Sequence, residues 1–328
     1  MSLTPLRFEP IFQYRLWGGR KLEKYSREPI EVKGPVGEAW ILSDRDDFAS
    51  VVAEGPLKGK TLRELFAEEK EGMLGEVSGA YDRFPLLLKF LDAKEMLSVQ
   101  VHPSDAHKDL LPKGERGKTE SWLVMEADPG SSIYAGLEPG TTPEGMREKS
   151  AEGTIEEDLA SFEPNVGDGL FIEAGTVHAL GGGVVVFECQ QNSDVTFRLF
   201  DWNRVDEKTG KPRELHVEKA IRATDFEAVA VRPSQPVALS TMRVMREGMF
   251  ACEFFIVERL AGDEPFNVGK DGALRVVVCL GGEGFLRYFD QPFDVKLGDV
   301  WVIPASVGEI EFTPSGKVVL AEIAVPAG

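Results

Sequence analysis

Short runs of apolar residues, bounded by glycine, proline and other turn residues, recur along most of the chain. Runs of this kind predict short β-strands. The first group of predicted strands lies at residues 84–90, 97–101, 120–125, 132–137, 170–172, 184–190 and 195–200. A second group follows a polar, proline-bearing linker at 232–236 and lies at 254–257, 274–279, 285–289, 300–303 and 318–323. The pattern therefore predicts a mainly β protein in two parts.

Helical spacing is confined to a few inserts in the first part. The sequence Thr61-Leu-Arg-Glu64 has the spacing of a capping box, and the apolar residues after it predict a helix to about Gly72. Further helices are expected at 104–111, 142–162 and 216–224. The second of these contains another candidate capping box, Thr154 to Glu157. The predicted strands 120–125 and 132–137 flank an Asp-Pro-Gly turn, so we expect them to pair.

Composition and charge narrow the classes of partner. The chain has 328 residues, and its 55 acidic residues outnumber 37 basic ones to give a net charge of -18. This field disfavours nucleic acid and anionic membranes as partners, and an anionic substrate would need a local basic pocket. No apolar run approaches the ~20 residues of a membrane span. The three cysteines are widely spaced in apolar runs, which is typical of a reduced, cytoplasmic protein.

One pattern occurs twice, once with a terminal histidine and once without. Gly167 to His178 reads G-x5-E-x-G-xx-H, and Gly298 to Glu309 reads G-x5-P-x-S-xx-E. The frame resembles the second conserved motif of the cupin barrel, in which the terminal histidine binds a metal. The resemblance implies two cupin-like β-barrels of jelly-roll type, with short helical inserts in the first. We expect a metal-bearing catalytic domain at 1–232 and a degenerate, metal-free domain at 237–328.

The four histidines can be weighed singly as metal ligands. Gln100 and His102 are two residues apart in a predicted strand and therefore share a face, although a capped strand end would look the same. Glu120 opens the next strand, and His178 closes the repeated pattern. Two imidazoles, one carboxylate and an amide oxygen suit zinc in an open, catalytic site, and Mn, Fe or Co would also fit. Of the other two histidines, His107 is expected in a solvated helix and His216 in a structural role.

Six motifs in chain order make the resemblance more specific. They are Arg15-Leu-Trp-Gly-Gly19, Gly37-Glu-Ala-Trp40, Leu97 to Pro103, Lys118-Thr-Glu120, Gly175 to His178 and Ser193 to Arg198. Together they resemble the type I mannose-6-phosphate isomerases of the short bacterial form. The resemblance implies reversible conversion of mannose 6-phosphate and fructose 6-phosphate by cis-enediol proton transfer. It also implies one zinc ion per chain, held by Gln100, His102, Glu120 and His178. Longer members carry His-Lys-Pro-Glu where this chain has Gly-Lys-Thr-Glu, so a role for that histidine does not transfer.

Ionisable residues in apolar runs are the remaining candidates. Glu188 is costly to bury without a partner or a function, so it is either the catalytic base or half of a buried ion pair. The resemblance makes Arg198 the catalytic arginine, and Lys118 shares a strand face with Glu120. Asp194 could orient Arg198 or take part in proton transfer. Lys118 and Arg198 are expected as catalytic cations that also bind the substrate, and Ser98, on the face of Gln100, could add a hydroxyl for the phosphate.

Two other classes of function remain open on this sequence. The protein could be a metal-bearing cupin sugar binder without turnover, or a different cupin metalloenzyme such as a dioxygenase. An isomerase with broader sugar specificity is also compatible with the residues. In every case the partner is a small molecule, and we expect a monomer or a weak homodimer.

Overall fold

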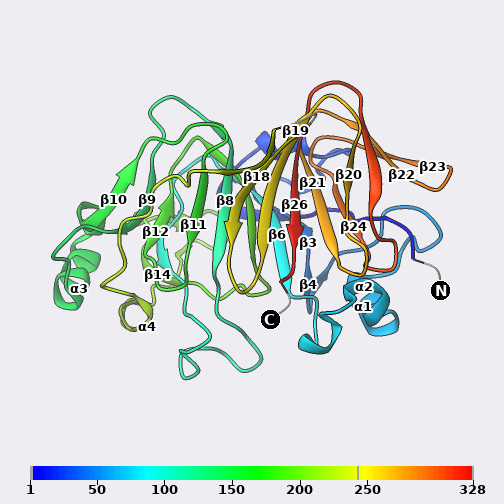
Figure 1. Cartoon of the computed structure of the whole chain (residues 1–328). Coiled ribbons are helices and arrows are strands. Elements are labelled where there is room, and N and C mark those ends of the chain that lie inside the picture. The colour runs from blue at the N-terminus through cyan, green and yellow to red at the C-terminus, as the bar shows by residue number, and fades with distance from the viewer. Residues whose placement is uncertain (1–2, 242–243, 327–328) are drawn as a thin grey trace.

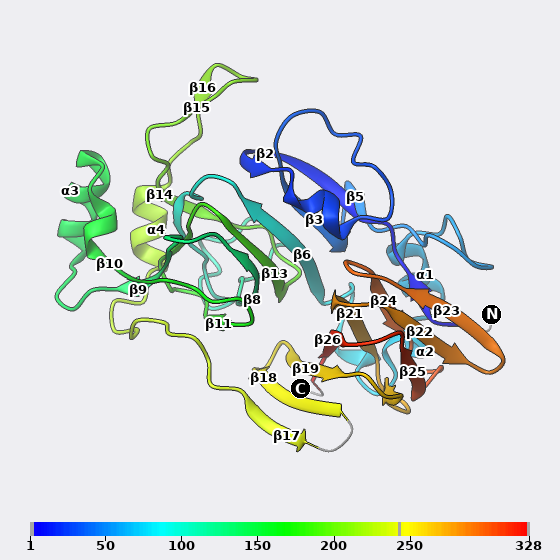
Figure 2. The ribbon, with the colours of Figure 1, turned by 90° about the horizontal axis from the view of Figure 1, so that it is seen from above.

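The protein is built mainly from antiparallel β-sheets, as the sequence predicts. A computed structural model describes residues 3–241 and 244–326 (Figure 1). Within these ranges, four larger sheets form two pairs, and helices lie around them (Figure 2). Residues 232–236 contain no helix or strand, in agreement with the predicted linker.

The first pair of sheets is formed by the earlier part of the chain. Its six-stranded sheet has the order β11-β8-β13-β6-β2-β3, and its five-stranded sheet has the order β10-β9-β12-β7-β14. The strands of the first sheet are β2 (Ile11–Gly19), β3 (Val36–Leu42), β6 (Leu86–Ala93), β8 (Glu120–Ala127), β11 (Gly169–Ile172) and β13 (Val184–Gln191). Those of the second are β7 (Val99–Val101), β9 (Ile133–Leu137), β10 (Leu159–Phe162), β12 (His178–Leu180) and β14 (Phe197–Phe200).

The second pair contains the later strands together with the first strand of the chain. The seven-stranded sheet has the order β1-β24-β21-β26-β19-β18-β17, and the four-stranded sheet has the order β20-β25-β22-β23. The strands are β1 (Leu6–Arg7), β17 (Val237–Thr241), β18 (Val244–Ala251), β19 (Ile256–Gly262), β20 (Phe266–Val268), β21 (Arg275–Gly281), β22 (Gly284–Tyr288), β23 (Gln291–Val295), β24 (Val300–Ile303), β25 (Ile310–Pro314) and β26 (Val318–Ala324). Because Leu6 pairs with Val302, the N-terminal residues complete the sheet formed by the C-terminal part.

Alternation along the strands explains how the two pairs pack together. In β13, Val184 and Val186 face the core between the six- and five-stranded sheets, whereas Val185 and Phe187 face the other way. The latter two join a core that also contains Val276 of the seven-stranded sheet. Neighbouring residues of a strand point to opposite faces, so a strand that is apolar throughout is covered on both sides. The two pairs of sheets are therefore packed back to back.

Short helices pack against the sheets. They are α1 (Leu62–Glu68), α2 (Lys70–Leu74), α3 (Pro143–Glu152) and α4 (Val217–Ala223), with 3₁₀ turns at Lys21–Tyr25, Ser78–Ala80 and Ile155–Asp158. The capping box of α1 is confirmed, since Thr61 and Glu64 each accept a hydrogen bond from the other's backbone N–H. Val99 and Val101 of β7 share a core with residues of α3 and α4, which places these helices on the outer face of the five-stranded sheet.

Three local predictions were wrong. The strands β8 and β9 do not pair with each other: β8 lies between β11 and β13, and β9 lies between β10 and β12. Residues 104–111 form turns instead of a helix, so His107 is not helical; its Nδ1 lies 2.9 Å from Ser104 Oγ, and this local contact competes with a helix. The helical insert ends early, because Thr154 makes no side-chain cap and residues 159–162 form strand β10.

The repeated Gly-Asp pattern has the same local structure in both copies. Gly167 and Gly298 have φ angles of 91° and 87°, a region that favours glycine. Asp168 Oδ2 accepts a 2.8 Å hydrogen bond from Asn165 N, and Asp299 Oδ2 accepts one of 2.7 Å from Lys296 N. Strands β11 and β24 follow these turns. The two copies thus start equivalent strands in the two pairs of sheets.

Candidate metal centre and active site

Two rows of polar side chains face each other between the sheets of the first pair. On the five-stranded sheet, Gln100 of β7 lies opposite His178 on one side and Arg198 on the other. On the six-stranded sheet, Glu188 of β13 lies opposite Trp122 and Lys89. Residues directly opposite on neighbouring strands share a face, so each row presents adjacent side chains to the same volume.

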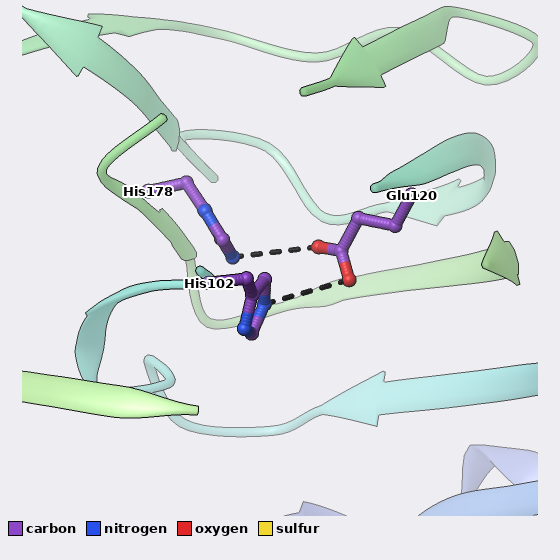
Figure 3. A group of neighbouring side chains, drawn as sticks. All are labelled: His102, Glu120 and His178. Carbon is purple, nitrogen blue, oxygen red and sulfur yellow. Dashed lines mark ion pairs between the residues drawn. The ribbon is translucent and has the colours of Figure 1, made fainter. Parts of the chain in front are cut away.

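At one end of these rows, His102, Glu120 and His178 converge (Figure 3). Glu120 Oε2 lies 3.5 Å from His102 Nε2, and Glu120 Oε1 lies 3.4 Å from His178 Nε2. The candidate ligand atoms all lie within 4.8 Å of one another, and all three residues are buried. His102 follows β7, Glu120 opens β8 and His178 opens β12, so three strand ends position the cluster.

The backbone fixes the orientation of both imidazoles. His102 Nδ1 lies 2.8 Å from the carbonyl oxygen of Val195, and His178 Nδ1 lies 2.9 Å from that of Thr176. A carbonyl oxygen can only accept, so Nδ1 carries the proton and Nε2 presents its lone pair to the cluster. Burial lowers the pKa of His102 well below its usual value and lowers that of His178 to about 4. Both rings are therefore neutral near pH 7, as a metal ligand must be.

The donors present fit a divalent metal ion. His102 Nε2 and Glu120 Oε1 are buried without a hydrogen-bond partner among the described residues. Unpartnered buried polar atoms are costly, and a cation would satisfy them. Gln100 lies beside the cluster with Nε2 3.3 Å from His178 Nε2, and rotation of its amide would present the oxygen that a metal requires. The cation now closest to Glu120 is Lys118, whose Nζ lies 2.8 Å from Oε2.

Glu188 lies in the centre of the facing row and is buried. Trp122 Nε1 donates a 2.9 Å hydrogen bond to its Oε2, while Oε1 lies 3.5 Å from Lys89 Nζ and 4.0 Å from Lys118 Nζ. The pKa of Glu188 is raised, first by burial and then by repulsion from Glu120; the two lysines and Trp122 oppose this rise. A carboxylate with a raised pKa, held between cations, can both accept and return a proton.

A cavity of about 290 Å³ gives access to these groups. It is lined by Gln100, Lys118 and Glu188, and it reaches the His-Glu-His cluster because the first two contact His178 and Glu120. Arg198 also lines it, and no ion pair joins Arg198 to a carboxylate in the described part of the chain. Its Nε is buried without a partner. The cavity therefore contains a cation that its own surroundings do not neutralise.

The remaining predicted residues also line the cavity. Ser98 Oγ donates a 3.3 Å hydrogen bond to Gln100 Oε1, which agrees with a shared strand face. Asp194 precedes strand β14, so strand alternation does not place it on the face of Arg198, and its Oδ1 lies 3.7 Å from Lys89 Nζ. His216 contacts Arg198 only through the backbone, where Arg198 N donates to Nδ1 over 3.3 Å.

Several residues of the site were missed by the sequence analysis. Lys89 is the clearest, because it is a buried cation within an apolar strand, the same signal that selected Glu188 and Arg198. Arg15 and Glu38 form a 2.9 Å ion pair at the cavity, and Glu38 also accepts from Trp40 Nε1 over 2.7 Å. These contacts bring together β2 and β3 and could not be foreseen from spacing along the chain.

The second copy of the pattern presents no comparable group at its end. Glu309, which stands where His178 stands in the first copy, is exposed and accepts a 2.5 Å hydrogen bond from Asn267.

The fold and the first site together define a class: a β-barrel protein that can hold a metal ion beside a buried carboxylate and several cations. Comparison with known proteins identifies the family within that class.

The catalytic-domain signature of type I phosphomannose isomerase matches residues 6–121. The mannose-6-phosphate isomerase ManA of Bacillus subtilis is 32% identical over 98% of this chain and 100% of its own length. A mannose-6-phosphate isomerase of Streptococcus mutans is 32% identical over 94% of this chain and 95% of its own. The chain therefore belongs to the type I phosphomannose isomerase family, and the resemblance noted from its motifs is confirmed.

Solved structures agree with this assignment. The crystal structure of the mannose 6-phosphate isomerase from Bacillus subtilis has a TM-score of 0.89 with this protein, at 32% identity over 98% of this chain and 99% of that one. A structure from Archaeoglobus fulgidus, at 22% identity and a TM-score of 0.80, shares the fold over the full length of both chains.

No helix in the described ranges is long and apolar enough to span a membrane.

Proposed function

We propose that this protein interconverts mannose 6-phosphate and fructose 6-phosphate in the cavity of the first pair of sheets. The observation that carries the proposal is the position of Glu188, a buried carboxylate in the same cavity as the unpaired Arg198. An aldose–ketose isomerisation moves a proton between C1 and C2 through a cis-enediol. It needs one group that takes and returns this proton, and positive charge near the two oxygens.

Glu188 is the proposed proton carrier. Its Oε2 is held by Trp122 Nε1, so Oε1 remains as the atom that faces the cations and the substrate volume. Lys89 and Lys118 favour the ionised form, in which the carboxylate can accept the proton, while burial favours its return. Asp194, 3.7 Å from Lys89, is the alternative proton carrier at the more open side of the cavity.

The cations orient the substrate. Lys118 is buried beside Glu120, and Arg198 lies two strands from His178, so the cavity has positive charge at both ends. We propose that Lys118 and Arg198 contact the substrate oxygens and that Ser98 adds a hydrogen bond. These preorganised charges overcome the repulsion that a phosphosugar meets from a protein with a net charge of -18.

Zinc is the metal we propose for the cluster, held by His102, Glu120 and His178 with Gln100 as a fourth ligand. When bound, it would supply a Lewis acid that stabilises negative charge on the O1 and O2 atoms of the sugar. One ion per chain is expected, in residues 1–232. We propose that residues 237–328 form a second, metal-free domain. The enzyme is proposed to be cytoplasmic.

A metal-dependence assay tests the proposed function. Protein treated with a chelator should lose its turnover of mannose 6-phosphate, and stoichiometric zinc should restore it. The test uses a coupled assay for fructose 6-phosphate. Chelated protein that keeps full turnover would contradict the metal-assisted mechanism, and absence of turnover in zinc-loaded protein would contradict the isomerase proposal.

A further inference from the structure

The segment that follows β14 brings another guanidinium group to the cavity. It contains the ribbon of β15 (Val205–Asp206) and β16 (Lys211–Pro212), which projects beside β2 in Figure 2. Lys208, between these strands, lies over the ring of Tyr14 at 3.2 Å from its centroid. Tyr14, Asp206 and Arg213 line the cavity together with Arg198. The ribbon thus forms part of the cavity wall on the side of β2.

Arg213 is held in place by a buried carboxylate. Its Nε donates a 2.8 Å hydrogen bond to Asp201 Oδ2, and its Nη2 donates one of 2.5 Å to Asp201 Oδ1. Arg204 Nη2 also donates to Asp201 Oδ1 over 2.5 Å, and Arg204 Nη1 donates to the carbonyl oxygen of Met96 over 2.6 Å. These bonds from Arg213 and Arg204 outweigh burial and lower the pKa of Asp201. Asp201 is therefore a fixed anchor for Arg213.

One edge of the Arg213 guanidinium remains available for a ligand. The bidentate contact with Asp201 uses Nε and Nη2, and Nη1 has no hydrogen-bond partner among the described residues. The Arg213 side chain is 21% exposed, so the free edge is reachable from the cavity. A guanidinium that is already oriented loses little freedom when it binds an oxyanion.

Arg213 and Arg198 act on the same part of the cavity. Both guanidinium groups line this cavity, and repulsion from Arg213 adds to burial in lowering the pKa of Arg198. Two nearby cations of which one has no carboxylate partner are stabilised when an anion binds between them. Asp206, one of the acidic residues that line the cavity, accepts hydrogen bonds from Lys208 N and Thr209 N through Oδ1 and is thus held by its own turn.

The location suits the far end of a phosphosugar. Arg198, Gln100 and His178 lie on three successive strands, so Arg198 is roughly 10 Å from the metal cluster by strand spacing. Isomerisation takes place at C1 and C2, and the phosphate is at the opposite end of the six-carbon chain. We propose that Arg213, together with Arg198, binds the substrate phosphate, with Asp201 as the positioning residue of Arg213. This inference rests on the proposed function.

The test compares Arg213→Ala with Lys211→Ala as a matched control. Lys211 is an exposed cation two residues away on the same ribbon and does not line the cavity. Four quantities are measured on zinc-loaded protein: the KM and the kcat for mannose 6-phosphate, the inhibition constant of inorganic phosphate, and that of unphosphorylated mannose. Arg213→Ala should raise the KM and the phosphate inhibition constant by about 10- to 100-fold, the value of one or two bonds to a charged group. The mannose inhibition constant and the melting temperature should remain near those of wild type.

A second variant tests the positioning role. Asp201→Asn should also raise the KM for mannose 6-phosphate. The double variant Asp201→Asn/Arg213→Ala should raise this KM no further than Arg213→Ala alone. If Arg213→Ala does not fold, Arg213→Gln takes its place. The inference is overturned if the variant changes phosphate inhibition no more than Lys211→Ala, or weakens phosphate and mannose equally.

Failure of the proposed function is recognised separately. Wild-type protein without turnover would contradict the isomerase proposal, but calorimetric titration of inorganic phosphate into zinc-loaded wild type and Arg213→Ala would still decide the phosphate site. Loss of phosphate binding in the variant supports the site, and equal binding overturns it.

Discussion

Glu322 lies in the second pair of sheets at the register position that Glu188 holds in the first. Glu188 is opposite Trp122 of β8, and Glu322 is opposite Val277 of β21. Trp122 and Val277 each lie, on their other side, opposite the third residue after the glycine of a Gly-Asp turn. The internal repeat thus extends from the turn to a buried carboxylate in each pair of sheets.

Glu322 and Glu188 differ in whether a carboxylate oxygen remains free to contact a ligand. Glu322 accepts a 2.7 Å bond from Arg246 and a 2.6 Å bond from Gly269 N, so both of its oxygens are used within the protein. Glu188 has one oxygen bound by Trp122, and the other, which has no hydrogen-bond partner in the described chain, lies 3.5 Å from Lys89. Glu322 is therefore suited to stabilising the fold, and Glu188 to reacting with a ligand.

This contrast gives the first prediction. Glu188→Gln keeps the size of the side chain but removes the proton acceptor, so kcat for mannose 6-phosphate should fall by about 10²- to 10⁴-fold. Binding of zinc and substrate should change little. Glu322→Gln should leave kcat unchanged while lowering the free energy of unfolding by ~1–3 kcal/mol, because Arg246 loses a buried charged partner. Kinetics and denaturant unfolding check both variants.

The opposite pattern would reverse the two assignments. A fully active Glu188→Gln would transfer the proton-carrier role to Asp194 or another group. An inactive but stable Glu322→Gln would imply that the second pair of sheets takes part in the reaction.

Arg198→Ala should separate function from stability. Arg198 has no carboxylate partner in the described residues, so its removal leaves no buried charge unpaired. We expect turnover to fall by roughly 10²-fold or more, as is typical when a preorganised electrostatic group is lost, with a melting temperature near that of wild type. Steady-state kinetics and thermal unfolding measure the two effects. Normal turnover would remove Arg198 from the site.

His178→Ala should abolish stoichiometric metal binding. It removes one of the three donors that lie within 4.8 Å of one another, and loss of one strong ligand weakens such a site by several kcal/mol or destroys it. Elemental analysis of the purified protein should find one metal ion per wild-type chain and less than a tenth of that in the variant. Two metal ions per wild-type chain would contradict a single site.

The buried histidines predict the pH dependence of the metal-free protein. Burial lowers the pKa of His178 from 6.5 to about 4, so between these values the unfolded chain binds a proton that the folded chain does not. The contribution of His178 to the free energy of unfolding is therefore fully present above pH 6.5. It is lost as the pH is lowered towards 4, which removes up to about 3 kcal/mol. His102 acts in the same direction. Urea unfolding of chelated protein at several pH values should show this fall, and His178→Gln should reduce it.

Local and chemical features of the site could be predicted from the sequence. Strand alternation predicts that Gln100 and His102 share a face, and prolines, glycines and polar residues mark the strand ends near Glu120 and His178. The full ligand set was implied by the resemblance to the type I mannose-6-phosphate isomerases. The isolated charges Glu188 and Arg198 stand out in apolar strands because burial of an unpaired charge is expensive. Lys89 carries the same signal and should have been selected.

The arrangement of strands into sheets could not be predicted in the same way. Strands β8 and β9 are joined by a short turn, which favours a hairpin, yet each pairs with strands that are distant in the sequence. Their partners are chosen by which apolar faces are buried together, and this is not encoded in the turn. For the same reason the contribution of Arg213 to the cavity emerges only when β14, the following ribbon and β2 are placed together.

Product analysis tests most directly whether the cavity beside Glu188 isomerises mannose 6-phosphate. Zinc-loaded wild-type protein is incubated with mannose 6-phosphate in deuterated water, and the sugars are followed by nuclear magnetic resonance. Fructose 6-phosphate should appear until equilibrium is reached, with solvent deuterium entering at C1 or C2 to the extent that Glu188 exchanges its proton with water. Unchanged mannose 6-phosphate in the presence of correctly folded, zinc-loaded protein would contradict this prediction.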